Sequence, residues 1–296
     1  MKVFVTGATG YVGGALVQAL VRGGHEVTGL SRDGEKDGVV AKLGARPVRG
    51  ALGELRALVR QMSEHDALVH AAMDYGLGPP ADLEAIEAML AAAGESGRTM
   101  QVVYTSGVWV LGETRTPAGE GSPLIRPAAA VAWRPPHERR VLESATDRLH
   151  TAVVRPGMVY GEKRGLVNMW FDSATKEGAA RFVGTGAQRW ALVHRSDLAE
   201  LYRAIVEKGA RGIFHGVDGA SPAVSEAAAA ASRAAGKGGA VKATPVEEAR
   251  KTMGPMADAF AMDQVVISTR GVDVGWAPKH PPFVKDAENA YREWRG

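Results

Sequence analysis

The chain has 296 residues, and its 36 Lys or Arg against 33 Asp or Glu give a formal net charge of only +3. Because the basic residues are scattered along the sequence, nucleic-acid binding is not expected. It contains no cysteine, which excludes disulfides and thiolate metal sites and fits a reducing compartment. Hydrophobic residues make up 45% of the chain, enough to build one large domain or a domain with an additional lobe.

The N-terminal stretch MKVFVTGATGYVGGALVQALV is apolar, but glycines at turn positions interrupt it. We therefore expect neither a signal peptide nor a membrane span, and we predict a cytoplasmic protein with no membrane partner.

Short apolar runs then alternate with longer helical patterns over the first 155 residues, which predicts a parallel sheet with crossover helices. Strands are expected at 2–7, 25–32, 45–50, 66–72, 101–107 and 150–156, and helices at 12–22, 53–63, 82–94 and 137–147. Further along the chain, strands are expected at 180–186 and 211–217 and an alanine-rich helix at 225–236.

The most informative segment is the glycine-rich stretch between the first strand and the first helix. Gly7 permits a tight turn, Gly10 lets the backbone approach a pyrophosphate, and Gly13 allows close packing of helix on strand. The helix N-terminus then offers free N–H groups to phosphates. With a strand before it and a helix after it, this spacing predicts dinucleotide binding, the alternative being a tight turn that holds no ligand.

The end of the second strand bears on the choice between NAD(H) and NADP(H). A carboxylate is expected there if the ribose 2′-hydroxyl is held, but Ser31 and Arg32 occupy this edge. Because an arginine pairs well with a phosphate, we predict that NADP(H) is favoured over NAD(H). The alternative is that Arg32 is solvated and Asp33 takes the hydroxyl.

Six segments together resemble the extended short-chain dehydrogenase/reductase family, also called the NAD-dependent epimerase/dehydratase family. They are TGATGYVG (6–13), DALVHAAM (66–73), VVYTSGVWVLG (102–112), VVRPGMVYG (153–161), LVHRSDLAE (192–200) and GVDVGWAPKH (271–280). The resemblance implies an α/β fold, a doubly wound parallel Rossmann sheet with a small split C-terminal α/β substrate lobe. It implies a nucleotide-binding domain at 1–160, with 186–218 returning to it, and a lobe formed by 161–185 and 219–296.

In such a fold the ligands lie at the carboxyl ends of the strands. We predict cofactor contacts, besides the three glycines, from Thr9, Tyr11, Val12, Ser31, Arg32, Ala51, Leu52, Ala71, Ala72, Met73, Thr105, Arg134, Pro156, Gly157 and Met158. Substrate contacts are predicted for Tyr75, Gly107, Trp109, Trp133 and Tyr160, and Trp170 and Trp190 are expected to add to an apolar rim.

The chain departs from the family where proton transfer is concerned. The family uses a tyrosine, a lysine four residues later, and a Ser or Thr on the fifth strand. Alignment on the fifth strand and on the helix HERRVLESA places these on Ala130, Arg134 and Gly107, with Ser106 beside the last. There is no tyrosine between residues 105 and 159. Arg134 keeps a cation but cannot act as a base, because a guanidinium stays protonated in proteins.

The segment AWRPPHE (132–138) replaces the family residues. Prolines at 135 and 136 suit the first turn of a helix, and Pro135 disfavours α geometry at Arg134. We therefore expect Trp133 and Arg134 on an extended approach, with the helix beginning near residue 135 or 136. His137 would then lie near the cofactor mouth as an acid or base, the alternative being a half-exposed helix residue. The predicted catalytic residues are Ser106, Arg134 and His137.

Other residues carry weaker signals. Tyr75, next to Asp74, is a candidate for a displaced proton-transferring tyrosine. The eight histidines show no HxxxH or HxH spacing, so we predict no metal site, and His194 and Asp197 are expected to be structural.

Three functions remain open at this point. The first is an NAD(P)H-dependent oxidoreductase with an altered proton-transfer site, acting on a small, hydrophobic or aromatic carbonyl or conjugated compound. The second is a non-catalytic NADP(H)-binding redox sensor. The third, a sugar-nucleotide epimerase or dehydratase, suffers most from the missing tyrosine. A homodimer is a possible assembly.

Overall fold

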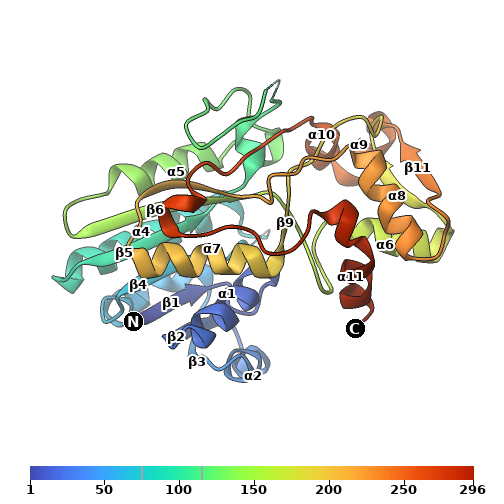
Figure 1. Cartoon of the computed structure of the whole chain (residues 1–296). Coiled ribbons are helices and arrows are strands. Elements are labelled where there is room, and N and C mark those ends of the chain that lie inside the picture. Colours follow the sequence, from blue (N-terminus) through green and yellow to red (C-terminus); the bar gives the residue numbers. More distant parts are fainter. Residues whose placement is uncertain (75, 115) are drawn as a thin grey trace.

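The computed structural model describes residues 1–74, 76–114 and 116–296. A parallel sheet of seven strands lies at its centre, in the order β10-β6-β5-β4-β1-β2-β3 (Figure 1). The strands are β1 Lys2–Thr6, β2 Glu26–Ser31, β3 Arg46–Arg49, β4 Ala67–His70, β5 Met100–Thr105, β6 Leu149–Pro156 and β10 Gly212–Gly216. This is the doubly wound Rossmann sheet expected from the sequence, and every predicted strand in it is confirmed, with ends that differ by one or a few residues.

Alternating side chains of the strands build two apolar layers, one on each face of the sheet. Val3 and Val5 of β1 pack with the helices α1 Tyr11–Arg22 and α7 Arg195–Lys208. Phe4, between them in sequence, faces the opposite side and packs with α4 Gly78–Ser96, and α5 Arg134–Glu143 covers the same side further along. Continuous burial on both faces explains why the strands are apolar runs without a polar alternation.

A second apolar core lies to one side of the sheet, at the right of Figure 1. Its elements are α6 Asn168–Glu177, β8 Ala180–Val183, α8 Val224–Ala234, β11 Val241–Thr244, α9 Val246–Met253, α10 Met256–Ala261 and α11 Phe283–Arg295, joined by β7 Met158–Tyr160 and β9 Leu192–His194. Trp170 and Trp190 stack in this core with ring centroids 5.3 Å apart. Both are buried, so the expectation that they add to a pocket rim is wrong.

The two cores meet along the stretch that we predict to return to the nucleotide domain. Within 186–218, α7 and β10 pack in the first core, whereas Trp190 and Leu192 pack in the second. The predicted domain boundaries therefore stay a prediction at this stretch.

Three local features differ from the sequence prediction. Helix α2 (Gly34–Lys42) is not among the predicted helices, because only Val40 of it is buried and it has no apolar stripe. The predicted helix at 53–63 is divided into a 3₁₀ helix, Leu52–Leu58, and the short α3, Val59–Met62. Helix α5 begins at Arg134, and Trp133 before it already has helical dihedral angles (φ −78°, ψ −20°). The expected extended approach is therefore wrong.

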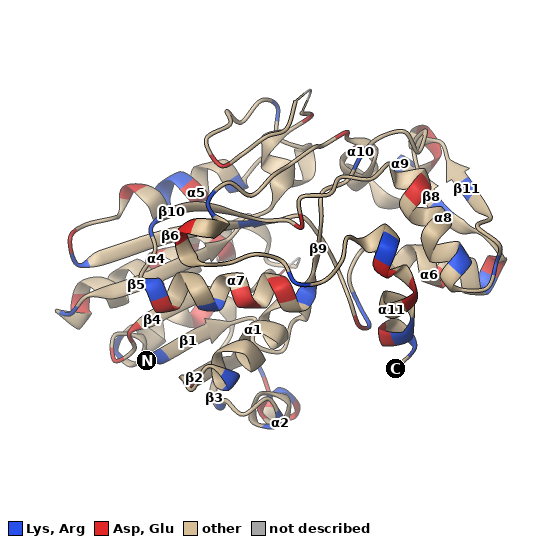
Figure 2. Ribbon diagram, in the orientation of Figure 1, with Lys and Arg blue, Asp and Glu red and all other residues tan. Residues whose placement is uncertain are grey.

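Acidic and basic residues are interspersed along α7 (Figure 2). Within the described residues, no helix combines the length and the apolar character needed to cross a membrane.

Candidate active site

The loop between β1 and α1 has the geometry that its glycines predict. Gly7 has φ +70°, and a Cβ added there would lie 2.6 Å from the carbonyl oxygen of Ala71. Only glycine fits such a position. Gly10 is the exposed N-cap of α1 and provides no side-chain cap, so the first N–H groups of this helix are left without a capping side chain. These groups are suited to bind a phosphate.

A cavity of about 320 Å³ opens beside this loop, at the carboxyl ends of β1, β2 and β4. Its walls comprise Gly7, Thr9, Gly10, Leu30, Arg32, Leu52, Ala71, Ala72, Met73 and Asp74. Most residues predicted for the adenosine half of a cofactor are thus brought together. Two are not. Ser31 is buried and donates a hydrogen bond to Asp37 (2.5 Å), and Ala51 lies outside the lining, with its N–H directed to Glu54 (3.2 Å).

The end of β2 distinguishes between the two residues considered for the ribose, Arg32 and Asp33. Asp33 accepts the N–H of Lys36 (2.9 Å) and caps α2, so its carboxylate is already engaged. Arg32 lines the cavity, its side chain is 68% exposed, and its nearest charged partner is Asp74 at 3.6 Å. Arg32 is therefore the side chain available to an anionic group at this edge.

A larger cavity, of about 600 Å³, continues from the first and shares Met73 with it. Its lining contains the predicted residues Tyr11, Val12, Thr105, Ser106, Gly107, Trp109, Trp133, Arg134, Pro156, Gly157 and Met158. It also contains Ala130, the position aligned with the family tyrosine, and residues that no sequence pattern indicated, namely Val108, Val131, Val159, Gly165, Leu166 and Met256. The wall is mostly apolar, and it is closed in part by Met256 from the second core.

Two polar groups stand out in this apolar wall. The Ser106 hydroxyl is buried and has no hydrogen-bond partner among the described residues. Arg134 donates from Nη1 to the Thr105 carbonyl (2.8 Å) and to the Tyr104 hydroxyl (3.2 Å), and its guanidinium lies 4.3 Å from the Trp133 ring centroid. Burial of an unpaired hydroxyl is unfavourable, which indicates a group kept for a ligand.

The structure contradicts the role expected of His137. It is buried, it is not part of the cavity lining, and its Nδ1 lies 2.8 Å from Asp82 on α4. His70 and the Tyr104 hydroxyl contact the same carboxylate, at 3.3 Å and 2.9 Å. Burial raises the pKa of Asp82, but the hydrogen bonds from His137 and His70 outweigh burial and hold this pKa well below its ordinary value. The first-turn histidine therefore joins α5 to α4 and does not face the cavity.

One predicted substrate contact, Tyr160, is likewise not in the lining. Tyr160 is buried, and its hydroxyl donates to the Pro281 carbonyl (3.0 Å), because β7 directs this ring into the second core. Tyr75 lies outside the described residues.

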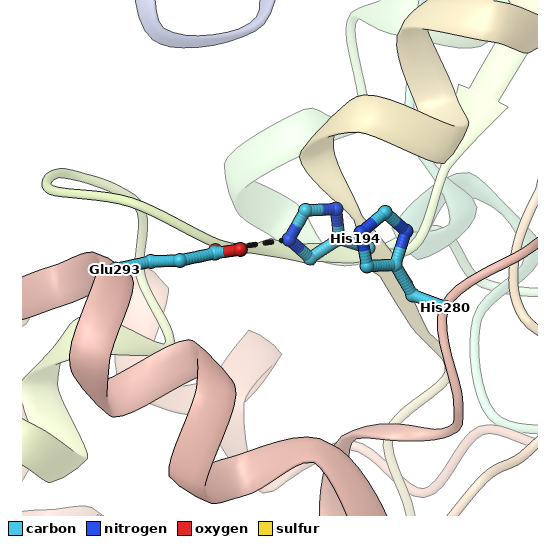
Figure 3. A group of neighbouring side chains, drawn as sticks. All are labelled: His194, His280 and Glu293. Carbon is cyan, nitrogen blue, oxygen red and sulfur yellow. Dashed lines mark hydrogen bonds and ion pairs between the residues drawn. The ribbon is translucent and has the colours of Figure 1, made fainter.

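A cluster of His194, His280 and Glu293 is the one described group whose ligand atoms lie close enough together to consider for a metal ion. The two rings stack face to face, 3.6 Å apart (Figure 3). Both nitrogens of His194 are engaged, Nδ1 by the Ser196 N–H (3.2 Å) and Nε2 by Glu293 (3.1 Å). Since ligand lone pairs lie in the ring planes, one ion cannot lie in two nearly parallel planes at once. The cluster joins β9 to α11 as a structural contact.

Comparisons with known proteins point to a family and a fold. A model of the NAD dependent epimerase/dehydratase family matches residues 3–215. The chain is 30% identical, over 308 aligned residues, to the uncharacterized protein C2A9.02 of Schizosaccharomyces pombe, covering 98% of this chain and 100% of that one. It is 31% identical to the 4-hydroxy-2-methyl-3-oxo-4-farnesyl-3,4-dihydroquinoline-1-oxide ketoreductase of Stigmatella aurantiaca, covering 74% and 69%. The structure of human epimerase family protein SDR39U1 with NADPH superposes with a TM-score of 0.81 over 99% of both chains, at 22% identity.

Proposed function

Since the chain belongs to the NAD dependent epimerase/dehydratase family, we propose that it is an NADP(H)-dependent oxidoreductase acting on a small apolar carbonyl or conjugated compound. One observation carries the proposal. Ser106, whose hydroxyl is buried and unpaired among the described residues, and Arg134 both belong to the wall of one largely apolar cavity, which continues from the cleft at the phosphate loop. The relative named as a ketoreductase supports the carbonyl class.

The residues at the cleft fit a nicotinamide dinucleotide. The α1 N-terminus with Gly10 would hold the pyrophosphate, Arg32 the 2′-phosphate, and Pro156 to Met158 the nicotinamide end. When bound, the nicotinamide ring gives or takes the hydride.

In this proposal the chain's own residues bind and polarise the substrate. Ser106 donates a hydrogen bond to the substrate oxygen, and Arg134 stabilises the negative charge that develops on it. Arg134 stays charged throughout, so the proton comes from water. The exposed side chain of Leu166 at the edge of the cavity marks where water reaches it.

The proposal is tested by titrating the purified protein with NADPH and NADH, following fluorescence, and then adding aromatic ketones, enones and imines while recording absorbance at 340 nm. We expect tight NADPH binding with turnover of at least one carbonyl or conjugated compound. Tight binding with no turnover across the panel would reject the oxidoreductase and favour the redox sensor. If the panel gave no turnover but a sugar nucleotide added afterwards were converted, the epimerase or dehydratase would be favoured.

Arg32→Ala is expected to weaken NADPH binding by about 10- to 100-fold and to leave NADH binding within about twofold, because only NADPH carries the 2′-phosphate. Dissociation constants for both nucleotides check this. Arg22→Ala is the control, since Arg22 is an exposed arginine at the far end of α1. Equal weakening of both nucleotides by Arg32→Ala would contradict the assignment.

A further inference from the structure

The loop that follows β7, residues 161–166, lies against the start of α1. The Tyr11 hydroxyl, in the first turn of α1, donates to the Gly161 carbonyl (2.6 Å). A Cβ added to Gly165 would come within 2.8 Å of the Tyr11 ring, so glycine is needed for this close approach. Arg195 of α7 donates to the Tyr11 carbonyl (2.6 Å) and pairs with Glu162. The loop is thus held beside the phosphate loop from both of its ends.

The backbone of this loop is strained at two residues that are not glycine. Glu162 has φ +55° and Arg164 has φ +81°, in the left-handed region that glycine occupies at no steric cost. Such strain is found where a side chain is needed at that position. The ion pair with Arg195 accounts for the Glu162 side chain.

Arg164 lacks a comparable partner among the described residues. Its guanidinium is exposed and makes one hydrogen bond there, a long one of 3.4 Å from Nη1 to the Thr9 carbonyl. A single long hydrogen bond to a neutral carbonyl stabilises Arg164 too little to offset the strain of its backbone. The position of the cation thus calls for an anionic partner.

The place of Arg164 identifies that partner. Thr9 lines the smaller cavity, while Gly165 and Leu166 line the larger one, so Arg164 lies where the two cavities adjoin. The uncapped N-terminus of α1 begins at the same place, with Gly10. We propose that Arg164 binds the pyrophosphate of the dinucleotide, opposite the phosphate loop. The inference rests on the proposed function, because it takes the ligand of the cleft to be a dinucleotide.

Arg164→Gly separates a binding role from a structural one. The glycine relieves the backbone, so the melting temperature of the protein without nucleotide is expected to stay equal or rise. The dissociation constants of NADPH and NADH are both expected to rise by about tenfold, the effect of losing one charge-assisted hydrogen bond. Lys163 is the neighbouring exposed cation of the same loop, and Lys163→Ala is expected to change neither the melting temperature nor the two dissociation constants.

The results for Arg164→Gly separate a failure of this inference from a failure of the proposed function. If the unmodified protein binds both nucleotides and Arg164→Gly binds them within twofold of it, the inference is overturned while the proposed function stands. A loss confined to NADPH would assign Arg164 to the 2′-phosphate and overturn the pyrophosphate contact. A lower melting temperature with unchanged binding would show a purely structural role. Absence of nucleotide binding by the unmodified protein would overturn the proposed function, and the inference with it.

Discussion

Arg134→Ala is expected to lower kcat/KM for the carbonyl substrate by about 100-fold or more, the effect of removing one positioned donor from a developing oxyanion. The loss should fall mainly on kcat, because the charge on the substrate oxygen is largest in the transition state. Steady-state kinetics at saturating NADPH measure it. Arg134→Lys keeps a cation at this position but not the planar fork, and it should recover only part of the activity.

Two controls make this result interpretable. Arg134 also bonds Tyr104 and Thr105, so the melting temperature of each variant must show that the fold is retained. His137→Gln is expected to lower stability with little direct effect on kcat, because His137 contacts Asp82 and not the cavity. If His137→Gln removed turnover while the folded fraction was unchanged, and Arg134→Ala did not, proton transfer would belong to the histidine.

Much of the cleft can be predicted from the sequence, because tight turns and strand ends require particular residue types at recognisable spacings. The glycines of the β1–α1 turn and the residues at the ends of neighbouring parallel strands must converge once the sheet order is set. Arg32, Ser106 and Arg134 therefore line cavities, as the pattern predicts.

What the sequence missed depends on partners far along the chain. The side-chain partner of His137 is Asp82, 55 residues earlier in the chain. No local sequence pattern distinguishes Asp82 from any other aspartate on a helix. The Tyr160 hydroxyl bonds the carbonyl of Pro281, 121 residues later. Ser31 is the exception, because its partner Asp37 is only six residues away, on the helix α2 that the sequence pattern did not indicate. Met256 reaches the larger cavity from the second core, and its place is set by how the lobe packs. In each case tertiary packing decides between a buried contact and a cavity wall.

The Glu138–Arg155 pair connects α5 to β6, one turn after Arg134. Both side chains are 3% exposed, and Arg155 donates from Nε and Nη2 to the carboxylate at 3.0 and 2.5 Å. His215 of β10 lies in register with Arg155, and burial lowers the pKa of His215, which favours its neutral form, so His215 supplies no charge in place of Glu138 or Arg155. The pair thus fixes α5, and with it Arg134, on the sheet.

Glu138→Ala is expected to lower the free energy of unfolding by about 3–5 kcal/mol, because it leaves Arg155 buried without its counter-charge. Urea unfolding at pH 7 measures this, with an unchanged m value as evidence that the same transition is compared. Glu87→Ala is the matched control, because it breaks the exposed Glu87–Arg140 pair between α4 and α5 and should cost less than about 1 kcal/mol.

The double variant Glu138→Leu with Arg155→Met removes both charges and should recover most of the lost stability. Stability regained in the double variant with activity still low would mean that the ion pair, beyond holding the fold, sets the position of the Arg134 guanidinium. A cost below 1 kcal/mol for Glu138→Ala alone would mean that α5 is held by its apolar contacts and that the pair is dispensable.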